Sequence, residues 1–210
     1  MKNIVFILII LFGAISTLEA DVKKWKLEQV GFLNIDRNEK DYGGFSGLLI
    51  KNEGTEALVV TDKSFFFVLE LRRDDNDFLT GYSVIKKGRI LSSKGEHLNG
   101  RNTDSESIAM DANNNYFISF ESNHRIMMHA EVGGKGSFVP KHPLFRKLYV
   151  NKGIETLAID NDNRLIAIPE KPPSGISSIP IFRLQNNKWE IIKYIKIKDS
   201  FPLGIEPSIQ

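Results

Sequence analysis

Residues 105–121 read SESIAMDANNNYFISFE, and residues 154–170 read IETLAIDNDNRLIAIPE. Each stretch contains two short apolar runs separated by Asn and Asp, which tolerate the positive φ that tight hairpins need. Residues 45–62, FSGLLIKNEGTEALVVTD, follow the same plan with Asn52 and Gly54 in the turn. Three copies of one strand-turn-strand unit predict a repeat architecture.

The spacing within the copies is constant. Fifteen residues separate the two marked positions in each: Gly47 and Asp62, Glu106 and Glu121, Glu155 and Glu170. A third apolar run follows in every copy, at residues 65–71, 125–129 and 179–184, and a fourth follows in two of them, at residues 82–85 and 189–197. Residues 189–197 alternate with the period of two that is typical of a half-buried strand.

Four short strands per unit of 59 residues (Gly47 to Glu106) and then 49 residues (Glu106 to Glu155) are typical of propeller blades. No stretch has a convincing helical stripe with caps, so the predicted fold is all-β, a β-propeller of four-stranded antiparallel blades. Residues 133–136, Gly-Gly-Lys-Gly, are interpreted as a flexible loop.

The N-terminus has the features of a secretory signal. Lys2 precedes an apolar run from Ile4 to Phe12, and small and polar residues end at Ala20. A membrane anchor is the competing interpretation, but a span needs about 20 apolar residues and this run is interrupted earlier. We therefore expect residues 1–20 to be cleaved, leaving residues 21–210 as an exported domain, periplasmic or extracellular, without stable membrane anchoring.

Composition excludes several classes of site. The chain has no cysteine, which excludes disulfides, thiolate metal sites and thiol nucleophiles. Its net charge is +2, and the signal carries one charge of each sign, Lys2 and Glu19, so the mature balance is unchanged. Such a balance predicts no nucleic-acid partner and no anionic-membrane partner.

Four strings point to a family: GGFSGL at 43–48, DSESIAMD at 104–111, YFISFESNHRI at 116–126, and KGIETLAIDNDNRLIAIPE at 152–170. They resemble successive blade starts of the phytase-like family, described as esterase-like activity of phytase, from about Gly43 to Gly204. The resemblance implies an exported bacterial β-propeller, distantly related to calcium-dependent propeller phytases. It also implies hydrolysis of a phosphoric or other ester as a candidate activity.

Paired carboxylates are the candidate site. A turn centred between Asn113 and Asn114 would set Glu106 opposite Glu121 across the hairpin, and the equivalent turn would do the same for Glu155 and Glu170. Like charges so placed destabilise a sheet and raise one another's pKa unless a cation compensates. Calcium takes six to eight oxygen ligands. The candidate metal ligands are Asp62, Asp104, Glu106, Glu121, Glu155 and Glu170.

Two other interpretations stay open. The carboxylates could belong to an acid–base lattice with Lys63, Arg125 and Lys171, or be solvated loop charges with no joint role. In the metal-site interpretation, Glu106 and Glu155 are the catalytic candidates that polarise water. Arg125 and Arg101 would then bind the anionic group of the substrate, which suits the planar guanidinium.

The sequence thus predicts a propeller that binds a phosphorylated or esterified small molecule at an acidic channel mouth holding calcium. If the propeller is an enzyme, it would hydrolyse that molecule there. The alternative is a non-enzymatic propeller that uses the same mouth for a ligand or a protein.

The repeat also predicts an incomplete ring of about three to four blades. A further step of 49 residues from Glu155 reaches Gly204, shortly before the last residue, Gln210, so we expect a C-terminally truncated propeller. Uncovered blade faces would favour self-association. The predicted core residues of the first two strands are Ile108, Met110, Ile118, Leu157, Ile159 and Ile166.

Overall fold

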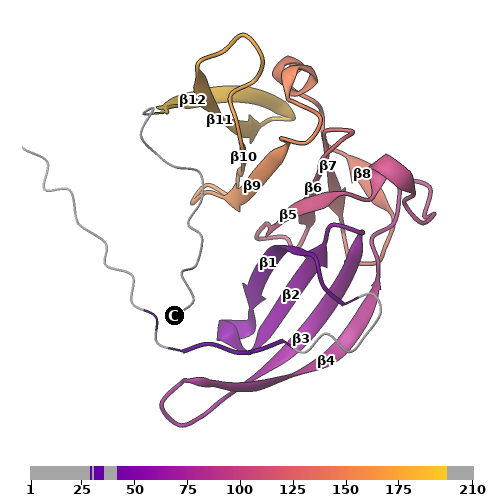
Figure 1. Cartoon of the computed structure of the whole chain (residues 1–210), viewed down its shortest axis with the longest axis vertical. Helices are drawn as coiled ribbons and strands as arrows, with labels where there is room; N and C mark the ends of the chain where they lie inside the picture. Colours follow the sequence, from indigo (N-terminus) through magenta and orange to yellow (C-terminus); the bar gives the residue numbers. More distant parts are fainter. Residues whose placement is uncertain (1–28, 30, 36–41, 198–210) are drawn as a thin grey trace, which may run out of the picture. The chain divides into compact units, whose positions relative to one another are not determined.

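The computed structural model describes residue 29, residues 31–35 and residues 42–197. These residues form three four-stranded antiparallel sheets (Figure 1), each made of consecutive strands, which confirms the predicted all-β propeller fold. The first sheet contains β1 (Phe45–Lys51), β2 (Glu56–Thr61), β3 (Phe65–Arg73) and β4 (Leu79–Arg89). The second contains β5 (Ser105–Met110), β6 (Tyr116–Phe120), β7 (Arg125–His129) and β8 (Gly136–Phe138). The third contains β9 (Ile154–Ile159), β10 (Leu165–Pro169), β11 (Ser178–Gln185) and β12 (Lys188–Lys196).

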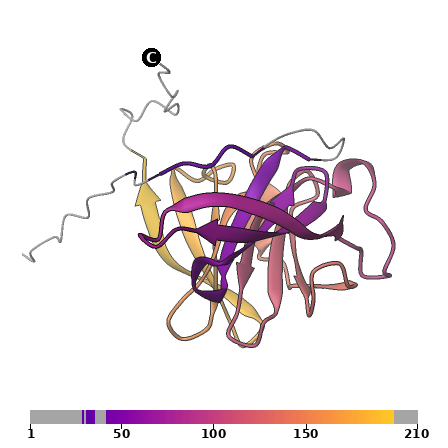
Figure 2. The same cartoon turned by 90° about the horizontal axis from the view of Figure 1, so that it is seen from below.

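Three short 3-10 turns complete the described elements: η1 (Asn52–Gly54), η2 (Gly100–Asn102) and η3 (Pro143–Lys147). The first strands of neighbouring sheets contact one another, β1 with β5 and β5 with β9 (Figures 1 and 2). Gly47 allows the first of these contacts, because a Cβ there would lie 2.7 Å from Val60 Cγ2 and 3.1 Å from the backbone nitrogen of Ile108. The three sheets are therefore successive blades, packed in chain order.

Apolar side chains fill the space between blades. Leu58, Val60, Phe66, Ile108, Ile118 and Met127 are buried together between the first and second blades. Phe117, Ile126, Phe145, Leu157, Leu165 and Phe182 are buried between the second and third. Every residue of β6 is buried. It has a blade on each side, so Ile118 and Phe117, which point to opposite faces, pack into different clusters.

Two predictions about strands need correction. Residues 133–136 are not simply a loop, because Gly136 begins β8 and pairs with His129 of β7. The predicted core set is right for Ile108, Ile118 and Leu157, which are buried, while Met110 and Ile159 are partly buried against the same clusters. Ile166 pairs with the exposed Ala158 and lies on the opposite face of the third blade from the buried Leu165 and Ala167.

Truncation of Ile118 is expected to cost about 2–5 kcal/mol of the free energy of unfolding, because the side chain is fully buried and Ile118→Ala leaves a cavity. Ile166→Ala should cost less than half as much, since part of that side chain already contacts solvent. Urea unfolding midpoints at a common slope measure both values. Equal losses would mean that the two faces of these strands are assigned wrongly.

Some predictions fall on other parts of the chain. The signal at 1–20 and the start of a further unit near Gly204 lie outside the described residues. Self-association stays a prediction, although Leu48, Ile50, Ile195 and Ile197 are exposed at 42–60%. None of the helices in the described ranges is long and apolar enough to cross a membrane.

Candidate functional site

A β-bulge interrupts the first strand of every blade. Pairing shifts between Phe45 and Gly47 in β1, between Ser105 and Ser107 in β5, and at Pro169 in β10, where Ile154 is paired and Glu155 is skipped. The extra residues are Ser46, Glu106 and Glu155. A bulge residue has no partner directly across the ladder. The predicted direct opposition of Glu106 to Glu121 and of Glu155 to Glu170 is therefore wrong.

The same backbone hydrogen bond closes the open end of each hairpin. The residue that follows the second strand donates its N–H to a carbonyl two positions before the bulge: Asp62 to Gly44 (2.9 Å), Glu121 to Asp104 (2.7 Å) and Glu170 to Gly153 (3.0 Å). Glu106 and Glu155 thus share their position with Ser46 rather than with Gly47. The sequence alignment missed this shift because the first hairpin has one more residue between these positions, with η1 in its turn.

Five carboxylates from two blades come together at this end. Asp104, Glu106 and Glu121 offer one oxygen each within 4.8 Å of one another, and so do Glu121, Glu155 and Glu170. We call these five residues the carboxylate cluster. Glu121 belongs to both triads and joins them. Asp62, which the sequence included among the ligands, is exposed in the first blade and enters neither triad.

Glu121 is fixed between the blades. Its side chain is buried, and Oε1 accepts a hydrogen bond of 2.8 Å from the backbone N–H of Gly153. A Cβ at Gly153 would lie 3.2 Å from both Glu121 Cγ and His124 Nδ1, so the lack of a side chain there lets the third blade approach Glu121. This contact brings the carboxylates of β5 and β9 into one cluster.

Among the described residues, the positive charge of Lys152 compensates the five carboxylates of the cluster only in part. Burial, followed by the charges of Glu155, Asp104 and Glu121, raises the pKa of Glu106 to about 8. Burial and neighbouring carboxylates also raise the pKa of Glu155. The pKa of Glu121 is raised mainly by burial, against the Gly153 N–H, which lowers it. The site would therefore be stabilised by an added cation.

In the part of the chain that the structure describes, Lys152 is the cation that contacts this cluster. Its Nζ lies 2.8 Å from Glu170 Oε1, and this hydrogen bond raises the pKa of Lys152. Among the described residues, Lys63, Arg125 and Lys171 form no ion pair with the cluster. The acid–base lattice expected from those three side chains is therefore not formed in the described part of the chain.

Arg125 has a structural position. Its guanidinium lies 4.0 Å from the centroid of the Phe120 ring and donates to the carbonyls of Asn102 (2.5 Å) and Asn123 (3.1 Å). The residue is 3% exposed, and burial lowers its pKa to about 10. These contacts do not leave Arg125 free to bind an anionic substrate, which corrects that expectation. Arg101 is exposed on η2, and no contact within the described residues brings it to the cluster.

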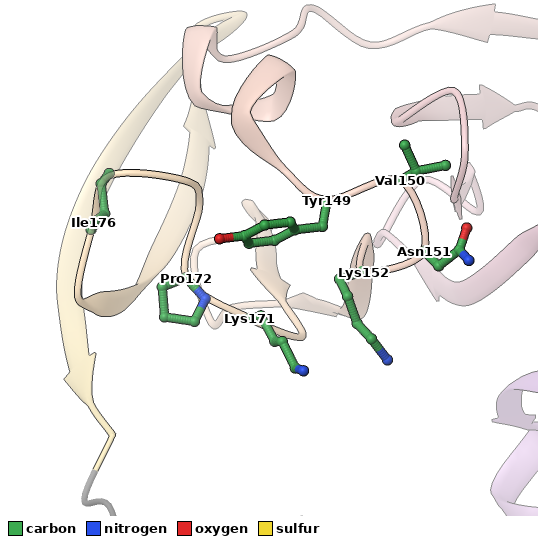
Figure 3. A pocket seen from close by; sticks show the side chains of 7 residues that line it. All are labelled: Tyr149, Val150, Asn151, Lys152, Lys171, Pro172 and Ile176. Atoms are coloured by element: carbon green, nitrogen blue, oxygen red, sulfur yellow. The ribbon is translucent and has the colours of Figure 1, made fainter.

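A pocket of about 510 Å³ (Figure 3) is lined in part by Lys152, whose Nζ contacts Glu170 of the cluster. We call it the lysine pocket; its lining residues are Tyr149, Val150, Asn151, Lys152, Lys171, Pro172 and Ile176. Tyr149 to Lys152 form a turn whose first carbonyl accepts from Lys152 N–H (2.9 Å) and lies 3.0 Å from His124 Nε2. Sequence reasoning missed this turn, since Tyr149 lies outside the repeated hairpins and Lys152 precedes the apolar run of the third one.

Comparison with solved structures finds partial likeness. One match is the PQQ-bound aldose sugar dehydrogenase from Streptomyces coelicolor, with 18% identity over 69% of this chain and 45% of that chain and a TM-score of 0.45. Another is virginiamycin B lyase from Staphylococcus aureus, with 12% identity over 75% and 42% of the two chains and a TM-score of 0.41. The chain thus spans less than half the length of these structures.

No curated protein matches the sequence. A family model does, and it covers residues 40–195, which include the first two blades, all but the last residue of the third, and the whole carboxylate cluster. The chain belongs to the phytase-like family, described as esterase-like activity of phytase.

Proposed function

We propose that this phytase-like propeller chain is exported, binds calcium at the carboxylate cluster and hydrolyses a phosphorylated or esterified small molecule there. The observation that carries the proposal is the pair of carboxylate triads that share Glu121. Five acidic groups gathered at one blade junction, with Lys152 as the paired cation, are costly unless they bind something positive.

The donor set fits a hard divalent cation. Calcium prefers carboxylate oxygens and takes six to eight of them at flexible geometry. We assign the ligands to Asp104, Glu106, Glu121, Glu155 and Glu170, with Asp62 left out because it enters neither triad. When bound, the ion would neutralise charge on a phosphoryl or acyl oxygen and lower the pKa of a water molecule.

The positions of the residues suggest their other roles in the proposed hydrolysis. Glu106 and Glu155 occupy equivalent bulges on adjacent blades, so both side chains flank the same space; we assign them the role of polarising the attacking water. Glu121 holds the two blades in register through Gly153. Lys152 offers a positive charge at the edge of the cluster.

Export is part of the same proposal. Lys2, the apolar run to Phe12 and Ala20 support a cleaved signal, and hence a periplasmic or extracellular location. Such compartments supply calcium at concentrations that suit extracellular calcium sites, whose dissociation constants are about 10⁻⁴–10⁻³ M.

Hydrolysis by residues 21–210 is expected to depend on calcium. A panel of phosphate monoesters and acyl esters should show turnover with calcium, at least about tenfold less after treatment with a chelator, and recovery when calcium is added back, because the ion supplies part of the transition-state stabilisation. Glu106→Gln and Glu155→Gln should lower turnover. Glu96→Gln, an exposed glutamate outside the cluster, serves as the control.

Turnover that is unaffected by the chelator would contradict the calcium mechanism. Absence of turnover on every ester would favour the alternative, a non-enzymatic propeller that binds a ligand or a protein at the same place.

A further inference from the structure

We propose that the lysine pocket is an anion subsite that binds a phosphate or carboxylate group carried on a flat ring. The inference deepens the proposed function, because it assigns the part of the substrate that lies beside the reacting group. Binding at the subsite, however, does not require hydrolysis or calcium and can be measured without them.

The charge of the pocket is the first argument. Its lining contains two lysines, Lys152 and Lys171, and no acidic residue. Lys171 is partly buried, and in the described part of the chain it forms no ion pair. Figure 3 shows the two side chains extending to the same side of the loops that carry them. An ammonium group in this position is available for a charge-assisted hydrogen bond to an anionic oxygen.

The apolar part of the pocket is the second argument. Tyr149 is 54% exposed although it carries a large ring, and Pro172 and Ile176 lie across the pocket from it. Figure 3 shows the Tyr149 ring directed towards the loop of Pro172 and Ile176. A flat ligand ring placed between them would gain apolar contact and stacking. A volume of about 510 Å³ is within the range of small-molecule sites.

The pocket is held in shape before a ligand arrives. The carbonyl of Val150 accepts a hydrogen bond of 3.1 Å from Ser122 N–H, and the carbonyl of Tyr149 is held by Lys152 N–H and by His124. The contact with His124 places the proton on Nε2, since a carbonyl oxygen can only accept. The backbone of the turn is therefore anchored to the second blade while the side chains of Tyr149 and Lys152 face outward. A preformed site loses less conformational freedom on binding.

Lys152 joins the pocket to the carboxylate cluster. Its ammonium contacts Glu170, and the next residue, Gly153, donates to Glu121. A ligand that reaches Lys152 from the pocket would thus lie beside Glu170 of the cluster.

Calorimetry with three probes tests the subsite in the presence of chelator: inorganic phosphate, phenyl phosphate and benzoate. We expect phenyl phosphate to bind about threefold to tenfold more tightly than inorganic phosphate, because of the ring. Lys171→Gln should weaken both phosphate probes by about tenfold. Tyr149→Ala should remove the preference for phenyl phosphate and leave inorganic phosphate unchanged. Benzoate shows whether a carboxylate replaces the phosphate.

Lys188→Gln is the matched control, since Lys188 is an exposed lysine on β12 outside the pocket. Circular dichroism verifies that each variant is folded. Unchanged affinity in Lys171→Gln, or no binding of any probe at millimolar concentration, would overturn the proposal.

The outcome is separable from that of the proposed function. Binding that depends on Lys171 without turnover of any ester would retain the subsite and remove the hydrolase. Calcium-dependent turnover that is indifferent to Lys171 and Tyr149 would retain the hydrolase and remove the subsite.

Discussion

In the presence of a chelator, the protein is expected to lose stability as the pH rises from about 5 to 8. The folded-state pKa of Glu106 is raised from 4.5 to about 8, so the folded protein keeps a proton that the unfolded chain releases. A carboxyl group whose pKa is higher in the folded state stabilises that state at pH values below its pKa in the unfolded chain. This contribution is lost as the pH approaches the pKa of the folded state. Glu121 and Glu155 are shifted in the same direction.

The size of the effect follows from proton linkage. One proton corresponds to about 1.4 kcal/mol per pH unit at most. Because Glu106 is only partly buried, solvent screening reduces the total, and we expect a loss of about 1–3 kcal/mol across the window. Saturating calcium at pH 8 should restore the loss, because it binds the folded state.

Urea unfolding at intervals between pH 5 and 8 measures this dependence for the parent and for Glu106→Gln. The variant should have a flatter profile and exceed the parent in stability at pH 8. Burial lowers the pKa of His124 and His129, so through these residues the stability rises with pH below about pH 6.5. Because the parent and Glu106→Gln share both histidines, the difference between their profiles cancels this contribution. Glu96→Gln should keep the parent profile. Identical profiles for the parent and Glu106→Gln would show that the cluster carries no electrostatic cost.

The blades could be predicted from sequence because their signals are local. Paired apolar runs around Asn-rich turns identify a hairpin, and repetition of the hairpin three times specifies a propeller rather than an isolated sheet. The turn residues behave as their type predicts: Asn114 and Asn163 adopt positive φ, at 62° and 59°. The strand β8 was missed because it has only three residues, Gly136–Phe138, too few to show a period.

The register could not be predicted, because a bulge does not change the types of residue on either strand. Counting from a turn centred between Asn113 and Asn114 gives Glu106 opposite Glu121. In the observed ladder Ile108 pairs with Ile118, which centres the turn on Asn113, and the bulge then skips Glu106. The turn centre and the bulge both change the pairing, without removing the carboxylates from the site. Both glutamates still lie at the open end of the hairpin, so the cluster was identified for a reason that is only partly right.

The contacts between blades could not be predicted from the sequence. Glu121 and Gly153 are separated by 32 residues, and their hydrogen bond depends on how two blades pack. The same is true of His124 and the Tyr149 turn, which shape the lysine pocket. Arg125 was expected at an anion because arginine suits that task, but its position beside Phe120 buries it instead.

Calcium binding is the second large effect expected. The parent should bind calcium with an affinity that increases as the pH rises from 6 to 8, and binding should release protons. Both effects are expected because the carboxyl groups must ionise to become ligands. Glu106→Gln removes a charge from the first triad and Glu155→Gln removes one from the second. Each should weaken binding at least about tenfold, and both together at least about a hundredfold, since calcium affinity depends on ligand charge.

The most direct test of the carboxylate cluster as a calcium site is therefore a calorimetric calcium titration of four proteins: the parent, Glu106→Gln, Glu155→Gln and the control Glu96→Gln. The account predicts saturable binding to the parent and to the control, with affinity reduced at least about tenfold in each cluster variant. Equal affinity in all four proteins, or no binding to the parent at millimolar calcium, would contradict it.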